Sequence, residues 1–93
     1  MVEEIENELT EQFFAAVLSL ENMDECYQFF RDNATVSEVR SLARRLEVAR
    51  LLNEGSTYDE IVEETGVSSA TVGRVKKVLE YGEGGLEKAI DRL

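Results

Sequence analysis

The chain has 93 residues, enough for one domain with a modest core. It contains no proline, no histidine and a single cysteine, Cys26, which excludes an internal disulfide and the usual zinc sites within one chain. Twenty acidic and ten basic residues give a net charge of −10, which is unusual for a protein that binds nucleic acid. The chain shows neither an apolar stretch long enough for a membrane span nor a signal-peptide pattern, so we expect a cytoplasmic protein without membrane contact.

The charge is distributed unevenly along the chain. Residues 1–34 contain nine acidic side chains and one arginine, whereas residues 35–93 contain eleven acidic and nine basic side chains. Most basic residues fall in two clusters, Arg40, Arg44, Arg45 and Arg50, and Arg74, Lys76 and Lys77. The second part of the chain can therefore present a local positive patch although the whole chain is acidic.

Helix starts and stops are well marked in the sequence. Thr35 with Glu38, and Thr57 with Glu60, each fit a capping box, in which a hydroxyl and a carboxylate satisfy the free N–H groups at a helix start. Glycines at positions 55, 66, 82, 84 and 85 mark helix ends. The sequence predicts an all-α chain forming one domain over residues 1–93, with six helices at 3–19, 23–31, 37–53, 58–65, 69–80 and 85–92.

The first predicted helix has a wide apolar stripe. Apolar side chains recur at every fourth residue, at Ile5, Leu9, Phe13 and Val17. Such a stripe is typical of packing against the protein's own core. Its width also fits contact with a second chain.

The third predicted helix is apolar on two nearly opposite sides. One side consists of Val39, Leu42, Ala43, Leu46 and Ala49, and the other of Val48, Leu51 and Leu52. A helix that is apolar on two faces is usually buried on both, and a short monomer has little material to cover it. We therefore expect a homodimer in which helices of two chains interlock. Arg45 lies between the two faces, where it either snorkels to water or serves a binding site.

Residues 58–80 have the form of a helix-turn-helix: a short helix, a glycine turn at Gly66 and a longer helix. The seam between the two helices is predicted to contain Ile61, Thr65, Val67, Val72 and Val75. On the side of the second helix that points away from this seam, the side chains are small and polar at the helix start and basic further along. A DNA recognition helix needs this composition.

Small side chains permit close approach to base edges, hydroxyls can bond to bases or phosphates, and the free N–H groups near Ser68 can bind a phosphate. Basic side chains neutralise the DNA backbone. The predicted DNA-binding residues are Ser68, Ser69, Ala70, Thr71, Gly73, Arg74, Lys76 and Lys77, with Arg40 and Arg44 from the third helix. The alternative is that Ser68 only caps the helix and the lysines only confer solubility.

The stretch "SEVRSLARRLEVARLLNEGSTYDEIVEETGVSSATVGRVKKVLEYGEGGLEKAI" resembles the Trp repressor superfamily, and within it proteins of the YerC/YecD type. The most specific parts are "RRLEVARLL", "TYDEIVEETGVSSATVGRV" and "YGEGG". The resemblance implies a six-helix Trp repressor-like fold and an intertwined homodimer, whose two helix-turn-helix units contact two half-sites in double-stranded DNA.

The resemblance also implies a ligand site, whose residues differ in part from those of the repressor. In the Trp repressor two arginines sandwich the bound tryptophan, and they match Arg45 and Arg74, while Thr35 matches a threonine near the start of the third helix. The repressor has a glycine where Val75 stands and a ligand-binding serine where Val78 stands. We therefore expect no response to tryptophan, with Val75 filling the place of the ligand. Another small ligand between Arg45 and Arg74 is the open alternative.

A catalytic role is not expected. The chain has no histidine, its one thiol has no evident base, and the carboxylates at 59–60 and 63–64 fit the solvated side of a short helix. We predict no cofactor and no metal. The leading interpretation is a dimeric, sequence-specific transcription regulator, and the alternative from another class is a protein-interaction module that keeps the fold without binding DNA.

Overall fold

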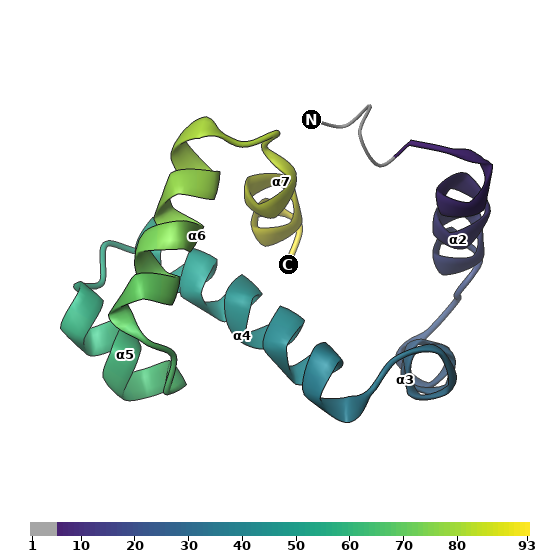
Figure 1. Cartoon of the computed structure of the whole chain (residues 1–93), viewed down its shortest axis with the longest axis horizontal. Coiled ribbons are helices and arrows are strands. Elements are labelled where there is room, and N and C mark those ends of the chain that lie inside the picture. Colours follow the sequence, from purple (N-terminus) through teal and green to yellow (C-terminus); the bar gives the residue numbers. More distant parts are fainter. Residues whose placement is uncertain (1–5) are drawn as a thin grey trace. The chain divides into compact units, whose positions relative to one another are not determined.

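The computed structural model describes residues 6–93 of the chain, and this part consists of six helices joined by short turns (Figure 1). The helices are α2 (Glu8–Leu18), α3 (Met23–Asn33), α4 (Val36–Asn53), α5 (Tyr58–Thr65), α6 (Ser69–Tyr81) and α7 (Gly85–Asp91). Residues 6–93 contain no strand. The all-α prediction is thus confirmed, and none of these helices is long and apolar enough to cross a membrane.

The predicted start of the first helix is wrong in its described part. Glu6 and Asn7 are not helical, and residues 3–5 lie outside the described residues. Asn7 is extended and its side chain accepts a hydrogen bond from the Thr10 N–H at 2.8 Å, so it caps the helix that begins at Glu8. The bounds of the other five helices agree with the prediction to within two residues.

Both predicted capping boxes are present. Thr57 and Glu60 exchange hydrogen bonds at the start of α5: the Glu60 carboxylate accepts from the Thr57 N–H at 2.8 Å, and the Thr57 hydroxyl accepts from the Glu60 N–H at 3.2 Å. Thr35 and Glu38 do the same at the start of α4, at 2.8 and 3.1 Å. These reciprocal bonds satisfy donors that the helix itself leaves free, so local sequence determines where both helices begin.

The chain divides into two compact units, residues 1–39 and residues 40–93, with α4 beginning in the first and continuing in the second. In the first unit the phenylalanines of α2 and α3 form a cluster: Phe13 lies with its ring centroid 5.7 Å from those of Phe14 and Phe29. No residue of α2 or α3 is buried. Of the apolar stripe of the first helix, Leu9 is 80% exposed, whereas Phe13 and Val17 are half-buried.

The second unit contains the buried core of the described residues. Its members come from α4, α5 and α6, and the side chains of Leu86 and Ile90 in α7 pack against them. The core consists of Val48, Ala49, Leu51, Ile61, Val72 and Val75. The predicted seam of the helix-turn-helix is confirmed, because Ile61, Val72 and Val75 are buried and the other two members are half-buried.

The turn between α5 and α6 depends on Gly66. Its φ of 77° lies in the left-handed region, where a side chain would be strained, and its N–H closes α5 on the Val62 carbonyl at 2.9 Å. The Thr65 hydroxyl donates to the Ile61 carbonyl at 2.7 Å and accepts from the Val67 N–H at 3.3 Å. The turn is therefore held by a glycine conformation and one threonine side chain.

The two apolar sides of α4 have different surroundings. On one side, Val48 and Leu51 are buried by the other helices of the second unit. Ala49, which belongs to the other apolar side, is also buried. Further along that other side Leu42 is 62% exposed and Ala43 is also exposed. One chain thus covers the second half of the helix and leaves much of the first half open.

The capping boxes make stability depend on pH. The N–H of Thr57 lowers the pKa of Glu60, and the N–H of Thr35 lowers the pKa of Glu38 in the same way. Because the folded-state pKa lies below the unfolded value, about 4.3, this stabilisation is complete above that pH. We expect it to be lost as the pH falls through the lower folded-state pKa. Glu60→Gln should reduce the fall in the free energy of unfolding between about pH 5 and pH 3.

Urea unfolding at a series of pH values measures this dependence. Glu63→Gln is the matched control, since Glu63 lies on the same helix and is exposed. The same pH dependence in wild type and Glu60→Gln would contradict a contribution from the capping bond.

Candidate nucleic-acid interface

The two sides of α6 have opposite characters. Val72 and Val75 face the core, with Val75 2% exposed. Five of the predicted DNA-binding residues on α6 are exposed and two, Thr71 and Gly73, are half-buried; the exposed ones are Ser69, Ala70, Arg74, Lys76 and Lys77. Packing of the valines therefore turns the small and basic side chains of this helix outward.

The first turn of α6 holds a chain of hydroxyl contacts. Ser68 caps the helix, accepting from the Thr71 N–H at 3.1 Å, and the two hydroxyl oxygens lie 3.1 Å apart. The Arg74 guanidinium donates from Nη2 to Thr71 Oγ1 at 3.0 Å. Ser68 is thus an N-cap, as the alternative interpretation held. The contacts also hold Arg74 along the helix start, and its other N–H donors make no side-chain hydrogen bond within residues 6–93.

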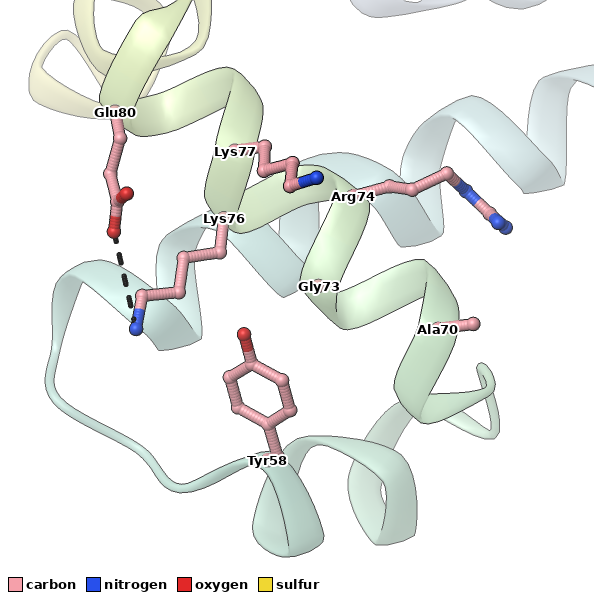
Figure 2. Close-up of a pocket in the computed structure, with 7 residues that line it drawn as sticks. All are labelled: Tyr58, Ala70, Gly73, Arg74, Lys76, Lys77 and Glu80. Carbon is pink, nitrogen blue, oxygen red and sulfur yellow. Dashed lines mark ion pairs between the residues drawn. The ribbon is translucent and has the colours of Figure 1, made fainter.

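Lys76 has one neighbour on another helix and one on its own helix. Its ammonium lies 5.8 Å from the ring centroid of Tyr58 in α5, a cation–π arrangement, and 4.0 Å from Glu80 Oε1. In Figure 2 Lys76, Tyr58 and Glu80 lie on one side of α6, whereas Arg74, Lys77 and Ala70 extend toward the other. The basic side chains of α6 thus flank the helix on both sides.

A shallow surface hollow of about 560 Å³ connects these residues (Figure 2). It is lined by Tyr58, Ala70, Gly73, Arg74, Lys76, Lys77 and Glu80. Three cationic side chains share it with one carboxylate, so it favours an anionic partner. Sequence reasoning missed Tyr58, because only the turn at Gly66 brings the start of α5 beside α6.

A second hollow of about 270 Å³ lies between α4 and the start of α6. It is lined by Ser41, Arg44, Arg45, Gly66, Val67, Thr71 and Arg74. The predicted ligand arginines Arg45 and Arg74 therefore reach one hollow, together with Arg44. Arg40 is exposed on α4 and does not line it, and Thr35 is engaged in the capping box of α4.

The expectation that Val75 takes the place of a ligand stays a prediction, and the structure gives the position of this side chain. Val75 lies in the core and is not one of the lining residues, so the space between Arg45 and Arg74 stays open. The reason is helical geometry: Val75 follows Arg74 by about 100° around α6, which directs the valine inward beside Val72. Val78, the other departure from the repressor pattern, is 46% exposed.

Two helices packed through a buried seam at a glycine turn, with the second helix presenting a small and basic outer face, define a helix-turn-helix protein. The chain belongs to the Trp repressor protein family, whose model matches residues 8–93. It is 48% identical over 92 residues to the protein YerC of Bacillus subtilis (strain 168), covering 99% of this chain and 88% of YerC.

Solved structures agree with this assignment. A TrpR-like protein from Eubacterium eligens ATCC 27750 is 43% identical and superposes with a TM-score of 0.93, covering 97% of this chain and 93% of that one. A candidate Trp repressor from Staphylococcus aureus is 42% identical with a TM-score of 0.94, covering 99% and 92%. The six-helix Trp repressor-like fold is therefore confirmed.

Proposed function

We propose that the protein is a sequence-specific DNA-binding transcription regulator that acts as a homodimer through α5 and α6. The observation that carries the proposal is the outer face of α6, where the predicted small and basic residues lie opposite the buried Val72 and Val75. Membership of the Trp repressor family and the likeness to TrpR-like structures support it.

In this mechanism the start of α6 enters the major groove. Ser69 and Ala70 are small enough to let the helix approach the base edges, and the Ala70 methyl can contact a thymine methyl. Arg74 and Lys77 extend from the same side of α6 and bind backbone phosphates, which position the helix without reading sequence (Figure 2). Arg40 and Arg44 add positive charge from α4.

Dimerisation is supported by the apolar surface that one chain leaves uncovered. Leu42 and Ala43 are exposed on α4, and neither α2 nor α3 contains a buried residue. Burial of a large aliphatic side chain contributes about 1.5–3 kcal/mol, so a second chain that covers these positions gains substantial stability. A two-fold dimer would then place two recognition helices about 34–36 Å apart, in successive major grooves.

The net charge of −10 favours the second candidate, a protein-interaction module. Screening by salt reduces the effect of this net charge on binding. At physiological ionic strength charges separated by more than a Debye length of about 8 Å are largely screened, so the charges beside the bound phosphate decide the local attraction. Around α6 these charges are Arg74, Lys76 and Lys77 with Glu80. The outer face of α6 therefore favours DNA binding over the interaction module.

DNA binding can be tested by fluorescence anisotropy with fragments selected from a random pool. We expect the wild type to bind with an affinity that falls as salt rises. Lys77→Ala should weaken binding to all sequences and reduce the slope of log affinity against log salt by about 0.9 for each phosphate that the variant no longer neutralises. Lys88→Ala, which removes the same exposed charge from α7, is the control and should bind as the wild type does.

Absence of any binding at micromolar protein and low salt would contradict the proposal and favour the interaction module. Equal salt slopes for Lys77→Ala and the wild type would show that the proposed docking of α6 is wrong.

The dimer can be tested at Leu42. Light scattering after size exclusion should give about twice the 10.5 kDa chain mass for the wild type. Leu42→Glu places a charge on the exposed apolar side of α4 and should shift the mass toward that of one chain, with a lower melting temperature. Leu42→Met keeps an apolar side chain of similar volume and should remain dimeric. A monomeric wild type would rule out the proposed assembly.

The hollow between Arg45 and Arg74 supports a regulator that responds to a small ligand as a further candidate. Three arginines line it, and none of the described residues lining it is a carboxylate, so a ligand of this hollow would carry negative charge. Tryptophan is disfavoured, because Val78 supplies no hydroxyl where the resemblance places a serine that holds the ligand's ammonium group. We propose that DNA binding does not require tryptophan.

Isothermal titration calorimetry checks this point. Addition of L-tryptophan to the wild type should give no saturable heat up to millimolar concentration, and the affinity for DNA should be the same with and without the amino acid. Saturable binding that disappears in Arg45→Ala would contradict the proposal and assign the hollow to tryptophan.

A further inference from the structure

Gly73 lies in the middle of α6, where neither the backbone conformation nor close packing requires a glycine. Its φ is not positive, unlike those of Gly55, Gly66 and Gly84, so no special backbone conformation requires a glycine. A Cβ built at this position would have Tyr58 Oη at 4.0 Å as its nearest neighbour, an ordinary contact distance. A glycine in a helix interior is destabilising relative to alanine. The open space beside the Tyr58 hydroxyl therefore points to a use outside the fold.

Tyr58 lies opposite this space, at the first residue of α5. Its ring is packed beneath the Lys76 ammonium and its hydroxyl points toward Gly73 (Figure 2). The side-chain hydrogen bonds of α5 and its cap involve Thr57, Glu60 and Thr65, and none of those in the described part of the chain uses the Tyr58 hydroxyl. Tyr58 is 37% exposed, so this hydroxyl is accessible from outside.

Lys76 completes the arrangement. The ring of Tyr58 attracts its ammonium without neutralising it, because a ring quadrupole carries no net charge. Its ion pair with Glu80 is 4.0 Å long, with both side chains about half exposed, so a stronger anion can replace the carboxylate at little cost. The hollow thus combines the Tyr58 hydroxyl, which is available as a donor, with the Lys76 ammonium, which the ring holds in place. Both groups lie beside Gly73, where the helix surface carries no side chain.

We propose that Tyr58, Gly73 and Lys76 form a subsite for one DNA backbone phosphate, with Tyr58 Oη donating a hydrogen bond and Lys76 supplying the charge. Gly73 lets the phosphate approach the helix. A phosphate fits better than a base edge, because tyrosine hydroxyls and lysines are common donors to the DNA backbone and Glu80 is the one carboxylate among the described residues that line the hollow. The inference rests on the proposed DNA-binding function and adds a contact from α5.

Tyr58→Phe tests the hydroxyl while keeping the ring that holds Lys76. We expect affinity to fall roughly tenfold for all sequences, as for the loss of one hydrogen bond to a charged acceptor. The salt slope should not change, because a neutral hydroxyl releases no counterion. Lys76→Ala should lower both affinity and slope. Tyr81→Phe, an equally conservative change at an exposed tyrosine that does not line the hollow, should bind as the wild type does.

Gly73→Ala tests the open space. Its melting temperature should be equal to or above that of the wild type, because alanine favours the helix and meets no close neighbour. Its affinity for DNA should nevertheless fall. A scan of the bound DNA with single methylphosphonates should then find one position that weakens the wild type and has a much smaller effect on Tyr58→Phe.

The outcomes separate this inference from the proposed function. If the wild type binds no DNA, both are wrong. If the wild type binds and Tyr58→Phe and Gly73→Ala bind equally well, the phosphate subsite alone is wrong. A loss in Tyr58→Phe that is confined to one base position would overturn the subsite in favour of base recognition.

Discussion

The orientation of α6 depends on burial of a few β-branched side chains between three helices. Val48 from α4, Ile61 from α5, and Val72 and Val75 from α6 are the largest fully buried side chains of the described residues. Each contributes about 1.5–3 kcal/mol when it leaves water. Since successive residues of a helix are about 100° apart, fixing positions 72 and 75 inward leaves 70, 74 and 77 facing outward. The same packing that stabilises the second unit therefore selects which face of α6 is available for a ligand.

Much of this arrangement could be predicted from the sequence, because it depends on local chemistry and periodicity. The capping boxes, the glycine at the turn and the spacing of apolar residues gave the helix bounds to within two residues for five helices and identified the seam. The prediction of where the first helix starts was wrong for a local reason. Asn7 is extended and its side chain accepts from the Thr10 N–H, so it caps the helix that begins at Glu8, whereas the acidic residues at 3, 4 and 6 had favoured an earlier start.

Contacts between segments could not be predicted in the same way. The position of Tyr58 beneath Lys76 depends on the angle between α5 and α6, which no local pattern encodes. The hollow at Arg45 and Arg74 likewise needs the distance between α4 and the turn. Alignment with the repressor brought those two arginines together correctly.

The structure also separates basic residues that composition treats as equal. Arg50, a member of the first basic cluster, donates from Nε to Glu47 Oε1 at 2.7 Å and from Nη1 to Glu54 Oε1 at 2.6 Å. Those carboxylates raise the pKa of Arg50 and cancel its charge toward a distant anion. Within the described part of the chain, Arg74 is held only by a neutral hydroxyl, and Lys76 by a ring and a carboxylate at 4.0 Å.

An approaching phosphate must displace whatever already neutralises a cation, so weakly held cations attract it at a lower cost. The acidic residues of the second unit neutralise Arg50 closely and leave the α6 cations comparatively free. An acidic chain can therefore offer a positive surface, because where its carboxylates lie matters more than how many it has.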